Sequence, residues 1–262
     1  SDLVRGGPSV LVAVLDTGVN YNHFDLQENI WVNPEYVPDS NNDGVINFRD
    51  VDSDGNRAIS KEELDQFCGM CNLNIMGWDC ILETNTPLDE TGHGTNVAGV
   101  IAATIDNGIG MAGVASIAKI LPIRVVGPNG QIREDDVAQG ILIAMENGAK
   151  VINMSFGGYD EFEAVQDEIC SAYYDEDIVL VAAAGNEDSS KKHYPAALDE
   201  VIAVAATDQN DSKGIWGGAS SPASNYGCWV DIAAPGLDIF TAFVGGGYGN
   251  NNGTSLAAPH VS

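Results

Sequence analysis

Long apolar runs and positive charge are both scarce in this 262-residue sequence. No stretch approaches the roughly eighteen consecutive apolar residues of a membrane span, and residues 1–8 lack the charged and then apolar segments of a signal peptide. Only 11 Lys and Arg stand against 38 Asp and Glu, so the net charge is −27. Such a field repels polyphosphates, and we expect neither a membrane span nor a nucleic-acid partner. The acidic excess is typical of a solvated surface in salty or calcium-rich surroundings.

Repeats and linkers are also missing. No repeat of about 20 to 50 residues occurs, and no Pro-rich or Ser-rich linker divides the chain. With 44% hydrophobic residues the chain can bury a sizeable core, so residues 1–262 are predicted to form one domain. Residues 37–80 are polar, acidic and without a long apolar run. We interpret them as an insertion that lacks a core of its own.

Cysteine occurs at five positions, 68, 71, 80, 170 and 228, so at least one thiol is unpaired within the chain. Cys68, Cys71 and Cys80 lie close in sequence, yet no fourth Cys or His is near enough to complete a tetrahedral zinc site. A local disulfide is favoured over free thiols, and zinc is favoured least; the connectivity stays open. A disulfide would indicate an oxidising compartment.

Short apolar runs without polar alternation predict strands that are buried on both faces. They are residues 10–15, 120–126, 151–154, 178–183, 201–205 and 230–233. Segments with helical periodicity lie between several of them, at 95–104, 134–145 and 161–174. This alternation predicts an α/β fold in which a parallel sheet is covered by helices on both faces, giving three α/β/α layers. The glycine-rich residues 245–252 are predicted to form a flexible loop that could shape an access channel.

Three residue types needed for nucleophilic catalysis stand at conspicuous places. Asp16 ends a predicted strand, where chemistry gathers in such sheets, although a turn or cap residue is the simpler interpretation. His93 lies between Gly92 and Gly94, which give the backbone freedom, although a loop histidine is the simpler interpretation. Ser255 begins a predicted helix, where a capping role is the alternative. Each signal is weak alone, but together they supply a nucleophile, a base and an orienting carboxylate.

Four ordered segments resemble the signature blocks of the subtilisin-like serine proteases. They are VLDTG at 14–18, GHGTNVAG at 92–99, AAGN at 183–186 and GTSLAAPHV at 253–261. The resemblance runs from about residue 10 to residue 261 without the insertion, and it implies a serine endopeptidase. By this resemblance Ser255 attacks the scissile carbonyl, His93 carries the proton, and Asp16 orients the imidazole. Asn186 matches the asparagine that stabilises the oxyanion.

The resemblance also implies where a polypeptide substrate binds. In this family an extended peptide adds to exposed strand edges, although an ordinary strand end is the alternative interpretation here. The matching residues are Gly127, Pro128, Asn129, Gly130, Ser155, Phe156, Gly157, Ala183 and Gly185. Residues 187–195 resemble a shortened loop at the base of the pocket, and their mixed charge leaves the specificity open.

The chain departs from the family pattern at both ends. Fifteen residues precede Asp16 and seven follow Ser255, whereas family members extend further in both directions. We therefore expect a chain that is truncated at both ends. Residues 213–227 are also longer than the corresponding turn of the family.

The insertion contains a calcium-binding pattern. Residues 39–50 place oxygen ligands at positions 1, 3, 5 and 12 of an EF-hand-type loop, with a carbonyl at position 7, and an acidic solvated loop is the alternative. The ligands are Asp39, Asn41, Asp43, Val45 and Asp50. A second loop counted from Asp50 reaches Glu63 two residues late. Because Asp50 cannot close one loop and open another, we expect one good site and leave open a second.

The second site would use Asp52, Asp54 and Glu63. Ser60 and Glu63 also form a capping box for a helix at 61–67, which is the simpler role for Glu63. A third calcium site is implied by resemblance alone, in residues 105–111. Its ligands would be Asp25, Ile105, Asn107, Ile109 and Met111.

These features predict a secreted or extracellular serine endopeptidase that binds Ca²⁺, acts on polypeptides as a monomer, and carries a propeptide or inhibitor at its active site. The alternative is a catalytically silent calcium-binding module of the same family. A serine esterase is disfavoured because the nucleophile lacks a Gly-x-Ser-x-Gly motif.

Overall fold

The structure is a computed structural model that describes residues 10–68, 74–216 and 222–262. Its centre is a seven-stranded sheet in the order β2-β3-β1-β4-β5-β6-β7, and every neighbouring pair is parallel. The strands are β1 (Leu11–Asp16), β2 (Trp78–Asp79), β3 (Lys119–Arg124), β4 (Val151–Met154), β5 (Val179–Ala183), β6 (Val201–Thr207) and β7 (Ile232–Pro235). The predicted parallel sheet is confirmed; six of its strands begin within two residues of the predicted positions, and β2 was not predicted.

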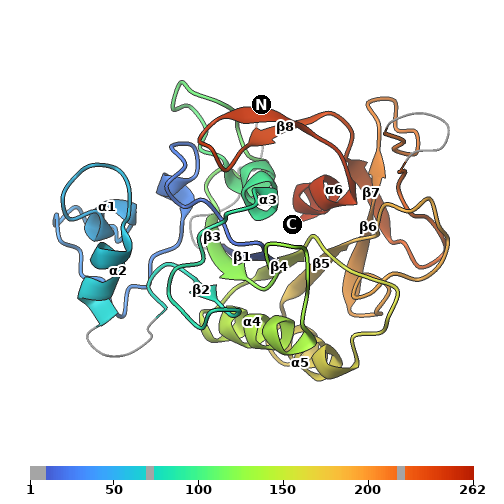
Figure 1. Ribbon diagram of the computed structural model, residues 1–262, viewed down its shortest axis with the longest axis horizontal. Coiled ribbons are helices and arrows are strands. Elements are labelled where there is room, and N and C mark those ends of the chain that lie inside the picture. Colours follow the sequence, from blue (N-terminus) through green and yellow to red (C-terminus); the bar gives the residue numbers. More distant parts are fainter. Residues whose placement is uncertain (1–9, 69–73, 217–221) are drawn as a thin grey trace.

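Helices cover both faces of this sheet (Figure 1). One face carries α3 (His93–Ala102) and α6 (Thr254–Val261), and the other carries α4 (Glu134–Glu146) and α5 (Gln166–Tyr174). The short 3-10 turn η2 (Glu163–Val165) precedes α5 where one continuous helix was expected, and η1 (Gln27–Asn29) follows β1. We call the described residues outside residues 37–80 the α/β frame, together with β2, which lies within the predicted insertion but belongs to the central sheet.

The central strands bury both faces because successive side chains point to opposite sides of a sheet. In β1, Ala13 and Leu15 belong to the apolar cluster of α4 and α5, whereas Val12 and Val14 belong to the cluster of α3. All of these side chains are almost completely buried. The absence of polar alternation in the sequence follows from this double burial.

The segment predicted as a flexible loop is partly a strand. Residues Tyr248–Asn251 form β9, which pairs antiparallel with β8 (Ile239–Ala242) in a two-stranded sheet. The ring of Tyr248 stacks on Phe240 with 5.8 Å between centroids. The hairpin is tied to α3 because the amide of Asn251 donates to the side chain of Asn96 at 2.8 Å. The expectation of a loop was wrong because these cross-strand contacts are invisible in a Gly- and Asn-rich sequence.

The insertion, residues 37–80, projects from one side of the frame and contains α1 (Phe48–Val51) and α2 (Lys61–Cys68) (Figure 1). Its apolar residues Phe48, Ile59 and Leu64 are at most 3% exposed. They belong to the same buried cluster as Val97 of α3. The insertion therefore shares the core of the frame, which the sparse apolar residues of its sequence did not indicate.

The cysteine expectations are partly corrected. Cys80 is a free and buried thiol, and burial raises its pKa to about 12, with the charges of Asp136 and Asp79 adding to the effect. Cys80 therefore takes no part in a local disulfide. The side chain of Cys68 and the whole of Cys71 lie outside the described residues, while Cys170 and Cys228 are free. Among the helices within the described ranges, none has the length and apolar character that a membrane crossing requires.

Candidate functional site

Asp16 and His93 form a close pair at the carboxyl end of β1. Asp16 is completely buried, and its Oδ1 accepts from the backbone N–H of Thr17 at 2.7 Å and lies 2.7 Å from Nδ1 of His93. The charge of Asp16 raises the pKa of His93; burial opposes this effect, and the hydrogen bond that Asp16 accepts from His93 and the charge of Asp89 support it. This pairing holds the imidazole in one orientation and stabilises its protonated form.

The beginning of α3 is held against β1. A Cβ on Gly94 would overlap the carbonyl oxygen of Gly18 and approach Cβ of Asp16 to 3.0 Å, so only glycine allows this contact. Asp89, which is 2% exposed, accepts hydrogen bonds from the N–H of Gly92 and from both the N–H and hydroxyl of Thr95. Sequence reasoning missed Asp89; its signal is a carboxylate just ahead of a helix start.

Ser255 lies at the second position of α6 and is 9% exposed. Its hydroxyl donates to the carbonyl of Ser155 at 3.0 Å, and the hydroxyl of Ser155 donates to the carbonyl of Ser255 at 2.9 Å. The capping alternative is therefore wrong, and α6 has no side-chain cap at its N-cap residue, Gly253.

Asn186 is oriented by the residue before Ser255. Thr254 donates to Oδ1 of Asn186 from its backbone N–H at 2.9 Å and from its hydroxyl at 3.0 Å. With Oδ1 occupied in this way, the amide NH₂ is the polar group left to donate to a ligand. The Thr254 hydroxyl in turn accepts from the N–H of Gly185 at 3.1 Å. Thr254 is a second residue that sequence reasoning missed, although it stands inside the quoted GTSLAAPHV block.

These side chains line one cavity of about 420 Å³. His93, Asn186 and Ser255 all face it, while Asp16 lies behind His93. The predicted wall residues that line it are Gly127, Pro128, Gly130, Ser155, Phe156, Gly157, Ala183 and Gly185. Asn129 is not among the lining residues; it lies in the turn that the isolated bridge between Val126 and Ile132 closes.

Two residues of the predicted base loop also reach the cavity, Glu187 and His193. The Oε2 atom of Glu187 accepts from the N–H of Asn186 at 2.9 Å and from the amide of Asn225 at 2.8 Å. His193 is buried, and burial lowers its pKa more than the charge of Glu187 raises it. The base of the cavity therefore combines a carboxylate with a neutral imidazole.

The insertion folds into two equivalent twelve-residue loops, at 39–50 and 52–63. The same five hydrogen bonds recur in each loop, each from a backbone N–H to a side-chain oxygen. The side chain at position 1 accepts from the N–H of position 6, the one at position 3 from position 5, and the one at position 5 from position 7. The carboxylate at position 12 accepts from the N–H groups of positions 2 and 9. The pairs are Asp39–Gly44, Asn41–Asp43, Asp43–Val45, Asp50–Ser40 and Asp50–Asn47 in the first loop, and Asp52–Arg57, Asp54–Asn56, Asn56–Ala58, Glu63–Ser53 and Glu63–Ser60 in the second. The second loop therefore begins at Asp52, and the count from Asp50 was wrong.

The error in the count has a local cause. Position 6 of an EF-hand-type loop has a positive φ, which Gly44 supplies in the first loop with a φ of 86°. In the second loop Arg57 occupies that position with a φ of 65°, and the glycine, Gly55, stands two residues earlier. A search guided by glycine therefore starts too early, and it also misses Asn56 at position 5. Aligning residues 52–63 with residues 39–50, position by position, would have revealed the correct start of the second loop.

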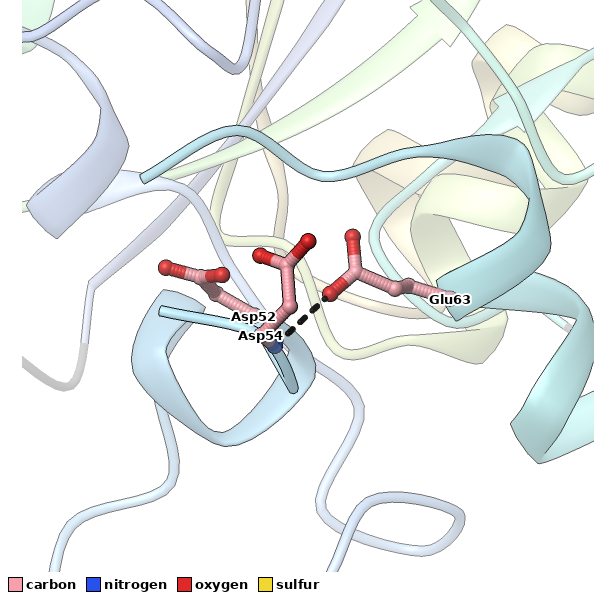
Figure 2. Close-up of side chains that lie close together, drawn as sticks. All are labelled: Asp52, Asp54 and Glu63. Atoms are coloured by element: carbon pink, nitrogen blue, oxygen red, sulfur yellow. Dashed lines mark hydrogen bonds between the residues drawn. The ribbon is translucent and has the colours of Figure 1, made fainter. Parts of the chain in front are cut away.

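The second loop brings its carboxylates together. Among the described His, Cys, Asp and Glu side chains, Asp52, Asp54 and Glu63 form a group in which one oxygen from each residue lies within 4.8 Å of the other two. Figure 2 shows Asp54 between the other two, with its N–H donating to Glu63 at 3.4 Å. Burial acts to raise the pKa of Glu63, but hydrogen bonds from Ser60 and Ser53 outweigh it and the pKa is lowered. The capping box of Ser60 and Glu63 is present as well.

In the first loop, burial and hydrogen bonds have opposing effects on the pKa of Asp50, as they do for Glu63 in the second loop. Its pKa is raised by burial and lowered more strongly by hydrogen bonds from Asn47 and Ser40. Asp50 also completes a capping box at the start of α1 with Asn47.

In the third predicted calcium loop, the proposed ligand residues make hydrogen bonds to one another. Asp25 is completely buried and accepts from the amide of Asn107 at 2.6 Å and from the N–H of Met111 at 3.0 Å. Asn107 accepts from the N–H of Ile109 at 3.1 Å. Ile105 lies in the turn that follows α3. Both oxygens of Asp25 thus already accept hydrogen bonds from the protein.

Sequence comparisons agree with these observations. Residues 7–262 match the model of the subtilase family. A thermophilic serine proteinase from Bacillus sp. (strain AK1) is 34% identical over 261 residues, which are 100% of this chain and 52% of that protein. Thermitase from Thermoactinomyces vulgaris is 42% identical over 188 residues, which are 72% of this chain and 64% of that protein. The chain thus spans less than two thirds of the length of either relative.

Solved structures have the same fold. A cold adapted subtilisin-like serine proteinase superposes with a TM-score of 0.70 and 26% identity, covering 100% of this chain and 74% of the other. A psychrophilic protease superposes with a TM-score of 0.71 and 30% identity, covering 98% and 75%. Because the family model spans nearly the whole chain and the four sequence blocks meet around one cavity, this chain belongs to the subtilase family.

Proposed function

We propose that the full-length protein is a serine endopeptidase in which Ser255 is the nucleophile, His93 the general base and Asp16 the orienting carboxylate. One observation carries this proposal: Nδ1 of His93 lies 2.7 Å from the buried Asp16, and the same imidazole lines a cavity with Ser255 and Asn186. Polypeptide substrates are proposed because one sequence relative and one solved structure are serine proteinases by name and the cavity is an open groove between two strand ends.

The steps follow the Ser-His-Asp scheme that is established for subtilisin and other serine proteases. Ser255 Oγ bonds to the scissile carbonyl carbon while Nε2 of His93 takes its proton. The oxyanion accepts hydrogen bonds from the Asn186 amide and the N–H of Ser255. His93 then protonates the leaving amine, the C–N bond breaks, and an acyl-enzyme remains. Water, deprotonated by His93, hydrolyses that ester and regenerates Ser255.

We place the substrate along the walls that line the cavity. An extended peptide would lie between residues 127–130 and 155–157, where backbone groups at strand ends can pair with it. A propeptide or inhibitor would occupy the same groove before activation. We further propose that residues 1–262 form one peptidase domain with the insertion at 37–80, acting as a secreted monomer.

Calcium is proposed at the two loops of the insertion. The donor set of the second loop fits a hard cation, because Asp52, Asp54 and Glu63 converge and all offer oxygen. Asn56, the carbonyl of Ala58 and Ser60 occupy positions 5, 7 and 9 of the same loop. The first loop offers Asp39, Asn41, Asp43, Val45 and Asp50 at matching positions. When bound, the ion would neutralise carboxylates that otherwise repel one another.

The third site, at Asp25 and Asn107, fits less well because Asp25 is its only proposed carboxylate ligand, whereas each loop of the insertion offers three. We therefore rank it below the two loops of the insertion.

A fluorophosphonate probe tests the enzyme against its alternative, a silent calcium-binding module. The probe labels a serine only when its hydroxyl is activated, so labelling of the full-length protein at Ser255 is expected. Ser212→Ala, an exposed serine outside the cavity, is the matched control and should not change labelling. Calcium binding without labelling of Ser255 would favour the silent module.

A further inference from the structure

The insertion is joined to the frame by the side chain of Asn22. Its Oδ1 accepts from the backbone N–H of Ile59 at 2.6 Å, and its Nδ2 donates to the carbonyl of Ile59 at 3.1 Å. Ile59 stands at position 8 of the second loop and is 3% exposed. One amide side chain therefore satisfies both backbone polar groups of a buried residue, as a neighbouring strand would.

Asn22 is connected to α3 through Asn20. The N–H of Asn22 donates to Oδ1 of Asn20 at 3.2 Å, and the amide of Asn20 donates to the carbonyl of Val244 at 2.7 Å. The N–H of Asn20 donates to the hydroxyl of Thr95, in the first turn of α3, at 3.0 Å. The turn at residues 20–22 thus contacts the insertion through the side chain of Asn22 and α3 through the backbone N–H of Asn20.

From Thr95 the contacts reach the reacting pair. The hydroxyl of Thr95 donates to Oδ2 of Asp89 at 2.6 Å, and Oδ1 of Asp89 accepts from the hydroxyl of Thr17 at 2.9 Å. Thr17 accepts from the N–H of Gly94 at 2.9 Å and donates its own N–H to Asp16 at 2.7 Å. Successive hydrogen bonds therefore connect Ile59 to Gly94, the neighbour of His93 in sequence, and to Thr17, the neighbour of Asp16.

We propose that Asn22 is a positioning residue for catalysis, through which the insertion holds the first turn of α3 and hence His93 in place. The inference rests on the proposed endopeptidase function. Asn22 touches neither substrate nor reacting atoms, and it acts by keeping Asn20 where it can donate to Thr95. A displacement of about 1 Å at a reacting group can lower a rate about 100-fold, so a modest loosening of α3 has a measurable cost.

A double-mutant cycle between Asn22→Ala and Thr95→Val tests the proposal in the full-length protein. Thr95→Val conserves shape but removes the hydroxyl that accepts from Asn20 and donates to Asp89, which are successive links of the same chain of contacts. We expect each change to lower kcat about threefold to tenfold and to leave KM within about twofold. The double variant should be no slower than the slower single variant, because both break one chain of contacts. Thr95→Ser, which keeps the hydroxyl, should restore kcat.

The matched control is Asn147→Ala. The amide of Asn147 donates to the carbonyl of Ile143 at 2.7 Å at the end of α4, away from the cavity. This variant should leave kcat unchanged, and its effect should add to that of Thr95→Val. Additive effects of Asn22→Ala and Thr95→Val on kcat would overturn the proposal, as would a lower melting temperature with unchanged kcat.

Hydrogen exchange in the inactive Ser255→Ala protein gives a readout that does not depend on activity. Asn22→Ala should speed exchange of the amides of Gly94 and Thr95 as well as that of Ile59. Faster exchange at Ile59 alone would overturn the coupling. If the parent protein is not labelled at Ser255 by a fluorophosphonate, the endopeptidase function fails instead, and the exchange data still decide whether the insertion holds α3.

Discussion

The α/β frame and the insertion organise their carboxylates in opposite ways. In the frame, Asp16 is completely buried beside one imidazole and raises the pKa of His93. In the insertion, Asp50 and Glu63 accept several backbone N–H groups, and these hydrogen bonds lower their pKa values despite burial. The first arrangement suits the proposed proton transfer by His93, and the second suits the proposed binding of a cation by ionised carboxylates.

The two regions also differ in what holds them together. Strands β1 and β5 bury apolar side chains on both faces, so the frame is stabilised by area removed from water. The insertion buries seven apolar side chains in the cluster of α3, and its two loops are held in addition by side-chain to backbone hydrogen bonds. Loss of a cation should therefore affect the insertion first, whereas loss of one catalytic hydroxyl should leave both regions folded.

The largest expected effect tests where the chemistry lies. Ser255→Ala and His93→Ala should each lower kcat about 10⁶-fold, the size of the loss measured in subtilisin, because the nucleophile or its proton acceptor is gone. Steady-state peptide hydrolysis and calorimetric melting in calcium provide the measurement. Hydrolysis by Ser255→Ala well above the uncatalysed rate would show that the frame does not act through this serine.

A smaller loss is expected from Asn186→Ala, which should lower kcat about 10²- to 10³-fold with little change in KM. The oxyanion that Asn186 stabilises exists only in the transition state. Thr254→Val, which removes the hydroxyl bonded to Oδ1 of Asn186, should cause part of the same loss, and Thr254→Ser should not. A change confined to KM would mean that Asn186 binds only the ground state.

Calcium removal should affect the insertion more than the frame. At a hundredfold excess over Kd, an ion stabilises the folded protein by about 2.7 kcal/mol, which corresponds to about 5 to 10 °C in Tm. With chelator, a second protease should cut first within residues 37–80, because the like charges of the emptied loops repel one another. Melting and limited digestion with calcium or chelator measure both effects.

Variants sharpen the comparison of the two loops. Asp52→Ala/Asp54→Ala should lose more of the calcium effect than Asp39→Ala/Asp43→Ala, because the carboxylates of the second loop converge more closely. Asp160→Ala/Glu176→Ala removes the same charge from exposed positions of the frame and should leave the calcium effect intact. The calcium assignment of the insertion is wrong if chelator changes neither melting nor cleavage, or if both loop variants behave like the parent.

The smallest expected effect concerns the pKa of His93. Because the base must be neutral, kcat/KM should rise with pH through a midpoint above the ordinary histidine value of about 6.5. In the Ser255→Ala protein, Asp16→Asn should lower this pKa, and Asp89→Asn should lower it less, since the charge of Asp16 is the larger cause. NMR titration of His93 measures both shifts. Equal shifts, or none, would contradict the assignment.

Much of the frame could be predicted because strands and helices depend on local patterns. The apolar runs located the six longer parallel strands to within two residues, but the two-residue β2 and the hairpin of β8 and β9 escaped. These elements are too short or too polar to show a period, and their pairing partners lie far away in sequence. The second calcium loop escaped for a different reason, because Arg57 takes the positive φ that glycine normally supplies.

The sequence by itself determined which residues we propose for the chemistry, since Asp16, His93, Asn186 and Ser255 stand in four recognisable blocks. Tertiary structure alone decided how these residues meet: His93 reaches Asp16 across 77 positions, and Ser255 reaches Ser155 across 100. It also decided which residues support them, such as Thr254 for Asn186 and Asp89 for the first turn of α3. The physical reason is that periodicity encodes only neighbours along the chain, whereas these contacts exist because parallel strands end at one edge of the sheet and bring distant residues together there.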